Sequence, residues 1–218
     1  MQSKRRALVA GGTGLVGSEL LALLGADARY RKVTSLVRRE VSARAGIENY
    51  VISFADLDRL ELPEIDDAYC CLGTTRSMAG SDDAFRRVDF DYVLAYARTA
   101  RRAGAVRFLL VSSMGADANS RFLYTRTKGE AETGLSALGF DAVGIARPSF
   151  LVGRRADARP AERAALVIGR IISPLIVGPL RRLRPIEVRK VAAGLIHLAF
   201  GAPGVTVLSS EQIAVAVK

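Results

Sequence analysis

Six short apolar runs recur along the first two thirds of the chain, and polar or amphipathic segments separate them. The runs lie at 6–11, 32–37, 50–54, 68–72, 107–113 and 142–147. Each is almost continuously apolar, as expected of strands that are buried on both faces of a parallel sheet. Helical periodicities occupy segments between them, at 15–25, 82–103 and 125–138. This alternation predicts an α/β fold with a doubly wound parallel sheet.

The pattern changes after the sixth apolar run. The elements that we expect there are a loop, two helices, a strand and a final helix, at 147–160, 160–178, 186–200, 204–209 and from Ser210 onward. Segments of this kind often cover the carboxyl edge of an open α/β sheet, where ligands bind. We therefore expect a single domain over 1–218, in which 149–218 forms a small helical cap on the substrate side.

Composition agrees with a globular domain. The chain has 218 residues, of which 50% are hydrophobic and 25% are charged, so it is not a disordered chain. Its net charge of +10 favours anionic partners such as phosphates. The arginines are spread along the chain in pairs, without a long basic run or an aromatic platform for bases. Nucleic acid is therefore not an expected partner.

Neither a membrane span nor a metal site is expected. The most apolar late stretch, 166–180, is interrupted by Arg170, Pro174 and Pro179, whereas a span needs about 20 clean apolar residues. The only histidine, His197, lies in an apolar segment without a cluster of further ligands. A structural histidine is the simpler interpretation.

The cysteines and the first residues bear on the compartment. Cys70 and Cys71 are neighbours in a predicted strand, so their side chains point to opposite faces and a disulfide between them is not expected. Lys4, Arg5 and Arg6 lead straight into the first apolar run, without a secretory signal pattern. From these features we expect a cytoplasmic protein.

The first apolar run ends in a glycine-rich turn, GGTGLVG. Gly11, Gly14 and Gly17 give the spacing G-x-x-G-x-x-G between a predicted strand and a predicted helix. A tight turn and a close approach to a pyrophosphate both require positions without side chains, and the free N–H groups of the helix start can face the phosphates. The predicted dinucleotide-binding residues of this turn are Gly11, Thr13, Gly14, Leu15, Val16 and Gly17. The alternative is a glycine-rich turn without a ligand.

The end of the second predicted strand bears on the choice between NAD and NADP. An Asp or Glu there usually holds the ribose 2′-hydroxyl of NAD, whereas this chain has Arg38 and Arg39. A guanidinium pairs bidentately with a 2′-phosphate, so NADP(H) is the preferred cofactor. Glu40 follows one position later, which leaves NAD(H) possible. Alternatively, the two arginines are solvated loop charges.

Two further strand ends are expected to line the cofactor. Asp56 and Leu57 follow the third apolar run, and Asp56 could meet the adenine amino group. Leu72, Gly73 and Thr74 follow the fourth, where a glycine lets the backbone pass close to the ribose. Each segment could equally be an ordinary turn, with Asp56 as a helix N-cap.

A serine, a tyrosine and a lysine follow in that order. Ser112 and Ser113 end the fifth apolar run, and Tyr124 precedes Lys128 by four positions, which places them on one helix face. A lysine ammonium favours the phenolate and can hold the nicotinamide ribose, while the tyrosine transfers a proton and a serine polarises the substrate oxygen. The candidate catalytic residues are Ser113, Tyr124 and Lys128, and Ser112, Tyr124 and Lys128 are also candidates for cofactor contact. The alternative is an ordinary helix that follows a strand end.

The glycine turn and these three residues together resemble the short-chain dehydrogenase/reductase superfamily. Three segments are similar to the Tat-interacting-protein-like branch of its atypical members, namely CCLGTTRSMAG (70–80), RVDFDYVLAYARTARRAG (87–104) and VSSMGADANSRFLYTRTKGEAE (111–132). The similarity covers about 6–155. It implies a Rossmann fold, NADP(H) binding and the same roles for the serine, the tyrosine and the lysine.

Two hypotheses for the function follow. The first is an NADP(H)-dependent oxidoreductase that acts on a small carbonyl or alcohol, with Tyr124 as acid/base. The second is a regulatory protein that binds NADP(H) as a sensed ligand without turnover, as some members of the branch are described. An epimerase-like reaction on a nucleotide sugar would use the same residues, but the short C-terminal segment disfavours it. A monomer and a homodimer are both compatible with the sequence.

Overall fold

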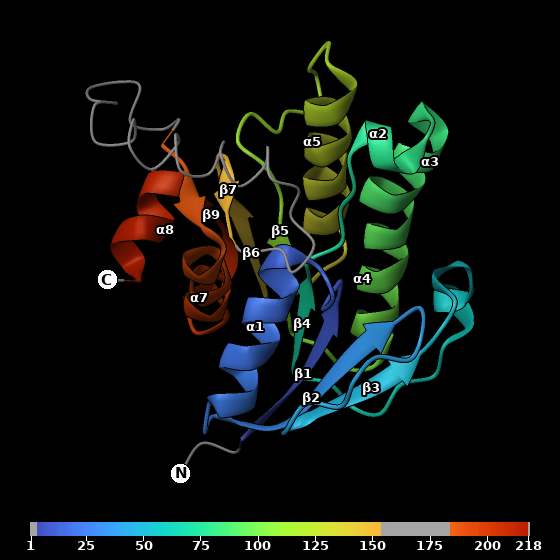
Figure 1. Cartoon of the computed structure of the whole chain (residues 1–218), viewed down its shortest axis with the longest axis vertical. Helices are drawn as coiled ribbons and strands as arrows, with labels where there is room; N and C mark the ends of the chain where they lie inside the picture. Colours follow the sequence, from blue (N-terminus) through green and yellow to red (C-terminus); the bar gives the residue numbers. More distant parts are fainter. Residues whose placement is uncertain (1–3, 154–183, 218) are drawn as a thin grey trace.

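The computed structural model describes residues 4–153 and 184–217 and contains a seven-stranded, fully parallel sheet (Figure 1). The strand order is β3-β2-β1-β4-β5-β6-β9, and each neighbouring pair is parallel. The strands are β1 (Arg5–Ala10), β2 (Tyr30–Val37), β3 (Ile47–Val51), β4 (Asp67–Cys70), β5 (Arg107–Val111), β6 (Ala142–Arg147) and β9 (Gly204–Ser209). The predicted doubly wound Rossmann sheet is confirmed.

Helices cover both faces of the sheet (Figure 1). Those described are α1 (Leu15–Ala26), α2 (Arg76–Ala79), α3 (Asp82–Arg86), α4 (Tyr92–Arg102), α5 (Leu123–Ser136), α7 (Val188–Ala199) and α8 (Ser210–Ala216). Two irregular turns are also described: the 3-10 turn η1 (Phe54–Arg59) lies between β3 and β4, and the π-helical turn η2 (Arg87–Asp91) joins α3 to α4. A small second ladder pairs β7 (Leu151–Val152) with β8 (Ile186–Glu187).

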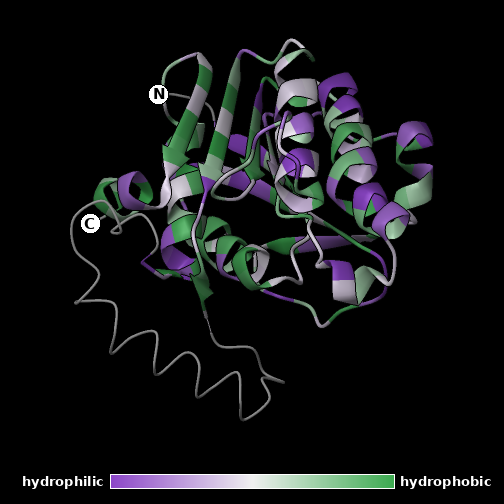
Figure 2. Cartoon of the chain, turned by 90° about the horizontal axis from the view of Figure 1, so that it is seen from above, coloured by the Kyte–Doolittle hydropathy of each residue, from purple (hydrophilic) through white to green (hydrophobic). Residues whose placement is uncertain are grey.

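Alternating side chains on each strand divide the core into two layers. On β1, Ala7 and Val9 pack with α1 and α7, whereas Leu8 and Ala10 pack with α4 and α5. The central strands are therefore buried on both faces, which explains why the sequence showed unbroken apolar runs there. The helices show both hydrophobic and hydrophilic residues, as expected of elements with one face on a sheet (Figure 2).

Two predicted elements differ from the structure in extent or continuity. The third strand begins and ends earlier than the predicted 50–54, because Ser53 caps the 3-10 turn that follows it, its side chain accepting the Ala55 N–H. Asp56 is therefore not the N-cap of this turn. The single helix predicted at 82–103 is α3, η2 and α4 in succession. The helix predicted at 160–178 lies outside the described residues.

The described C-terminal elements join the sheet and its layers. Helix α7 packs beside α1, and β9 pairs with β6 over its full length. Ser209 begins α8 through a capping box with Gln212, in which each residue satisfies a backbone N–H of the other. The predicted strand at 204–209 and the helix that begins at Ser210 are both confirmed.

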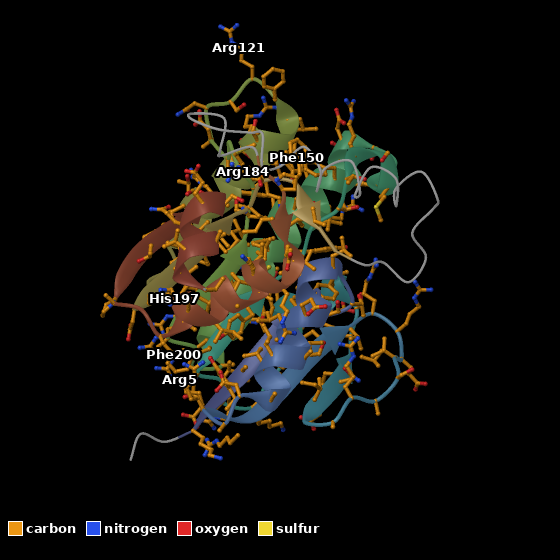
Figure 3. All side chains as sticks on the ribbon, turned by 60° about the vertical axis from the view of Figure 1, so that its left-hand side comes forward. Arg5, Arg121, Phe150, Arg184, His197 and Phe200 are labelled. Carbon is orange, nitrogen blue, oxygen red and sulfur yellow. The ribbon has the colours of Figure 1, made fainter. Side chains whose placement is uncertain are left out.

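A buried polar cluster lies at the amino end of the strands. The Asp67 carboxylate accepts hydrogen bonds from Tyr30 (2.6 Å) and Arg5 (3.2 Å). The Arg5 guanidinium also lies 4.2 Å from the centre of the Phe200 ring, and the two lie side by side in Figure 3. Burial raises the pKa of Asp67 despite these partners. This cluster ties β1, β2 and β4 to the end of α7, away from the carboxyl edge.

Helix α5 contains two glycines with different surroundings. A Cβ added at Gly129 would lie 2.2–2.3 Å from backbone atoms of Asp117 and Ala118, in the loop before the helix. A Cβ at Gly134 would meet only the side chain of Leu94, at 2.9 Å. A backbone cannot move aside as a side chain can, so Gly129 sets how closely α5 approaches its own preceding loop.

We expect Gly129→Ala to lower the free energy of unfolding by about 1–3 kcal/mol, because the new methyl group forces the loop away from α5. Gly134→Ala is the matched control in the same helix. There the gain in helix propensity, up to about 1 kcal/mol, offsets the displacement of Leu94. Urea denaturation followed by circular dichroism measures both effects. Equal destabilisation by the two substitutions would contradict the prediction.

Candidate functional site

The loops that the sequence analysis predicts to bind a ligand lie together at the carboxyl edge of the sheet. The chain moves outward from β1 to β2 and β3, and then returns to the other side of β1 with β4, β5 and β6. The strand order therefore reverses between β1 and β4, which is where open α/β folds bind ligands. The loops after β1 and β4 and the start of α5 all belong to this edge (Figure 1).

The turn after β1 is held by close contacts between backbone atoms. Gly11 has φ +81°, and a Cβ there would lie 2.5 Å from the Cys71 carbonyl group. A Cβ at Gly17 would lie 2.1 Å from the Gly11 carbonyl oxygen. The Gly14 N–H closes the turn by donating to that same oxygen at 3.0 Å. Side chains at Gly11 and Gly17 are thus excluded by the protein itself, before any ligand is considered.

Gly14 differs from the other two glycines. It is exposed, it is the N-cap of α1, and its backbone is extended (φ −78°, ψ 174°). Any residue can adopt that conformation, and the nearest atom to an added Cβ is the Gly11 oxygen at 3.3 Å. The missing side chain leaves open the approach to the first-turn N–H groups of α1, which form an anion-binding helix end.

The remaining residues of the turn have unequal exposure. Thr13 is exposed beside Gly14, and Leu15 is partly buried. Val16 is buried in the core layer of α1. Leu15 and Val16 can therefore contribute backbone N–H groups to a ligand, while their side chains pack against the sheet.

The loop after β4 packs between the glycine turn and the side chain of Lys128 on α5. Its start, Cys71, contacts Gly11 as described, and Leu72 follows partly buried. A Cβ added at Gly73 would lie 3.4 Å from both Lys128 Nζ and Asp89 Oδ1. The Thr74 N–H donates to Asp89 Oδ2 at 2.9 Å. This loop thus lies between the candidate phosphate site and the candidate catalytic lysine.

Lys128 is buried and ion-paired. Its side chain is only 7% exposed, and Nζ lies 2.7 Å from Asp89 Oδ1. Burial lowers the pKa of the ammonium, but the charges of Asp89 and Tyr124 raise it more, so the pKa lies above its usual value. The lysine is a cation that is fixed in place and faces the loop after β4.

Tyr124 lies one turn before Lys128 on the same face of α5. It is 46% exposed, and its ring lies 5.7 Å from the ring of Phe85, measured between centroids. The tyrosine ring thus packs against Phe85 of α3, while nearly half of the residue's surface remains accessible to a ligand. The order of exposure along this face, an open tyrosine followed by a buried lysine, suits a proton-transferring group supported by a fixed cation.

The two serines after β5 have different environments. The Ser112 hydroxyl donates to the buried carboxylate of Glu132, which also pairs with Arg147 from the end of β6. The Ser113 hydroxyl is buried and has no hydrogen-bond partner within the described part of the chain. Ser113 is therefore the serine whose hydroxyl is available, and Ser112 belongs to the contact between α5 and the strand ends.

Other candidate residues lie farther from this arrangement. Arg38 and Arg39 are exposed just after β2, and neither has a hydrogen-bond or ion-pair partner among the described residues. Asp56 is exposed on η1. The side chain of Leu57 is fully buried in the core layer of α4, and its carbonyl accepts from Thr99 at 2.7 Å. Leu57 is thus not brought to the site through its side chain.

The sequence reading missed Asp89, Glu132 and Arg147. Glu132 lies four residues after Lys128, so helical spacing alone places it on the same face. Arg147 ends the sixth apolar run, and opposite charges at these two positions were the available signal. No sequence pattern indicated Asp89, because the direction in which its side chain points depends on the π-helical turn in which it lies.

The segment after β6 lies at the same end of the molecule. The Met114 N–H donates to the Pro148 carbonyl at 3.0 Å, so this segment runs beside the loop that contains Ser113. The Ile186 N–H donates to the Phe150 carbonyl at 2.9 Å. Figure 3 shows Phe150 close to Arg184 at the end where Arg121 precedes α5, far from Arg5 and Phe200.

Neither a metal centre nor a membrane span emerges from the part of the chain that the structure describes. None of its groups of His, Cys, Asp and Glu could hold a metal ion, and His197 is exposed on α7. Cys70 and Cys71 are free thiols, and burial raises the pKa of Cys70 to about 12. None of the described helices is both long and apolar enough to cross a bilayer.

Comparison with known proteins identifies relatives by sequence. Rat protein HTATIP2 is 39% identical over 168 residues, which are 74% of this chain and 69% of the relative. The mitochondrial protein fmp52 of Emericella nidulans is 35% identical over 198 residues, 85% of each chain. No protein family model matches the chain.

Solved structures share the fold at lower identity. The UDP-N-acetylglucosamine 4-epimerase of Methanobrevibacter ruminantium is 18% identical, with a TM-score of 0.69 over 95% of this chain and 77% of the epimerase. The human epimerase family protein SDR39U1, solved with NADPH, is also 18% identical, with a TM-score of 0.65 over 94% and 74%. At this identity the likeness concerns the NAD(P)-binding Rossmann fold.

The expected cytoplasmic compartment is wrong in the light of these relatives. The fmp52 proteins of Emericella nidulans, Scheffersomyces stipitis and Candida albicans are all named mitochondrial. The expectation rested on the first residues and on the absence of a long apolar run, and neither feature distinguishes one aqueous compartment from another.

The sequence identity to these relatives and the share of each chain that it covers define the relationship. The chain belongs to the family of HTATIP2 and FMP52 proteins.

Proposed function

We propose that the chain is an NADP(H)-dependent oxidoreductase that interconverts a small carbonyl compound and its alcohol. The observation that carries this proposal is the placement of Lys128. It is a buried cation one helical turn from an accessible tyrosine, and it lies beside the loop after β4, whose first residue packs against the glycine turn. A purely structural ion pair needs neither the tyrosine nor the glycine turn.

The residues at the carboxyl edge fit a dinucleotide. Gly14 leaves the N-terminus of α1 open to a pyrophosphate, and Gly73 leaves room beside Lys128 for a ribose. Thr13 and Thr74 are the chain neighbours of these two glycines, and neither threonine is buried. When bound there, the nicotinamide would supply or accept the hydride.

The protein groups would carry the proton chemistry. The Tyr124 hydroxyl would donate a proton to the oxygen of the carbonyl during reduction and remove it during oxidation. Lys128 would hold the ribose hydroxyls and stabilise negative charge on the phenol oxygen. Ser113, whose hydroxyl has no hydrogen-bond partner among residues 4–153 and 184–217, would orient the substrate oxygen.

Two finer points are part of the same proposal. The guanidinium groups of Arg38 and Arg39, which have no ion-pair partner among the described residues, support a preference for NADP(H), because a 2′-phosphate would give them a bidentate partner. The segment 149–218 is proposed to complete the substrate side of a single domain. Its described start, where Ser149 donates to the Arg184 carbonyl, runs beside the Ser113 loop.

A first test separates ligand approach from folding. Gly14→Val is expected to abolish NADPH binding while the fold is kept, because the extended backbone accepts a side chain that would then stand over the helix end. Gly17→Ala is the contrasting variant and should unfold the turn, given the 2.1 Å approach to the Gly11 oxygen. Fluorescence titration with NADPH and thermal melting measure the two effects. A Gly14→Val protein that binds NADPH normally would remove the glycine turn from the site.

A second test concerns the adenosine end of the cofactor. The double variant Arg38→Ser, Arg39→Ser should bind NADPH about 10–100-fold more weakly and NADH unchanged, since two charge-assisted hydrogen bonds are lost. Arg31→Ser, an exposed arginine at the other end of β2, is the control. Isothermal titration calorimetry with NADPH and with NADH gives the ratio of the two dissociation constants for each variant. Equal losses for NADPH and NADH would contradict a role in 2′-phosphate recognition.

A third test addresses the chemical step. Tyr124→Phe should keep NADPH affinity and lower turnover about 10²–10⁴-fold, because the proton donor is removed while the ring remains. Tyr50→Phe, a similarly exposed tyrosine on β3, is the control. The assay is NADPH oxidation against a panel of aldehydes, ketones and quinones. Tight NADPH binding by wild type without turnover of any compound would favour the sensor hypothesis instead.

A further inference from the structure

Phe85 is a buried aromatic side chain that packs against the tyrosine of the site. It lies in the short helix α3 and is only 1% exposed. Its ring centre lies 5.7 Å from that of Tyr124, and the two ring planes differ by 31°. At this separation two aromatic rings attract each other beyond the effect of burying their area. Within the described residues, Phe85 is the aromatic ring that contacts Tyr124.

Helix α3 is joined to α5 at two points. The Ser81 hydroxyl caps the first turn of α3 by accepting a backbone N–H. Phe85 contacts Tyr124, and Arg86, the next residue, forms an ion pair with Glu130. Neighbouring residues of α3 thus contact two residues of α5 that lie six positions apart. Helix α3 therefore forms a wall beside the first turns of α5, and Phe85 is the part of this wall that meets the tyrosine ring.

Tyr124 is a side chain for which such a wall has consequences. It is 46% exposed, and exposed side chains exchange between rotamers within picoseconds to nanoseconds. A hydroxyl that transfers a proton has to lie within hydrogen-bond reach of the reacting oxygen, and a displacement of about 1 Å can cost about 100-fold in rate. A neighbour that restricts the ring to one rotamer therefore favours proton transfer.

We propose that Phe85 is a positioning residue, which holds the ring of Tyr124 in the rotamer that keeps its hydroxyl at the carboxyl edge. The space that the tyrosine ring would enter by turning toward α3 is already filled by the ring of Phe85. The inference rests on the proposed function for its effect on catalysis. Lys128 acts on the charge of the phenol oxygen, whereas Phe85 acts on the direction in which that oxygen points.

A first measurement compares two tyrosines of the wild-type protein. Tyr50 on β3 is 43% exposed, close to the value for Tyr124, and makes no ring contact within the described residues. The chain has six tyrosines, so each ring signal can be assigned by its absence in Tyr50→Phe or Tyr124→Phe. ¹³C relaxation of the ring carbons reports the amplitude of fast motion. We expect a clearly smaller amplitude for Tyr124 than for Tyr50, and equal amplitudes would overturn the proposal.

A second measurement compares Phe85→Leu with Phe108→Leu. Each replaces a buried aromatic ring by an apolar side chain, and Phe108 packs on Tyr96 and Phe140, away from the tyrosine of the site. In Phe85→Leu we expect larger ring motion of Tyr124 and a kcat that falls about 2–10-fold at unchanged NADPH affinity, as the loss of one aromatic pair predicts. Phe108→Leu should lower the melting temperature without either change. Equal ring motion and equal kcat in the two variants would overturn the proposal.

Failure of the proposed function is seen separately from failure of this inference. Ring motion is measured without cofactor or substrate, so it tests Phe85 even if the protein reduces none of the carbonyl compounds. Absence of turnover together with a restricted Tyr124 ring would contradict the proposed function and leave the contact with Phe85 supported. If Phe85→Leu does not fold, the comparison of Tyr124 with Tyr50 in the wild-type protein still decides.

Discussion

Close approach between backbone atoms at the turn after β1 is the constraint on which the carboxyl edge depends. The Gly11 oxygen accepts the Gly14 N–H and lies where the side chain of residue 17 would be, and Gly11 itself lies against the Cys71 carbonyl group. These contacts place α1 directly on β1 and bring the loop after β4 alongside it. Gly73 lies in that loop and packs against Asp89 and Lys128, which pair with each other. The placement of the loop is therefore linked to the position of this ion pair.

Much of the fold was predictable because burial on both faces of a sheet leaves a simple signature. The central strands appear as unbroken apolar runs, and their alternation with helical segments indicated a doubly wound parallel sheet. The prediction was least accurate where backbone hydrogen bonding, rather than apolar pattern, sets the boundary. Ser53 ends the region of the third strand by capping a turn, and the long helix before β5 contains a π turn that no spacing of apolar residues reveals.

The candidate site was predictable to a similar degree. Side chains that act through local spacing, such as Tyr124 and Lys128, could be paired from the sequence, since four residues make one helical turn. Asp89 could not, because its contact with Lys128 joins segments 39 residues apart through a turn of unusual geometry. The choice between Ser112 and Ser113 also required the structure, since only the position of Glu132 shows which hydroxyl is already engaged. The roles of these residues in chemistry remain predictions.

Three side chains of helix α5 that contact different parts of the molecule lie at intervals of four residues. Tyr124 faces the open edge, Lys128 meets Asp89, and Glu132 holds the ends of β5 and β6. Each residue of an α-helix turns the next by about 100° and advances it by about 1.5 Å, so these three side chains keep one heading only while the count between them is preserved. Substitutions on the outer side of α5 should therefore be tolerated. The insertion or deletion of a single residue within α5 would instead rotate Tyr124, Lys128 and Glu132 relative to one another and break their contacts.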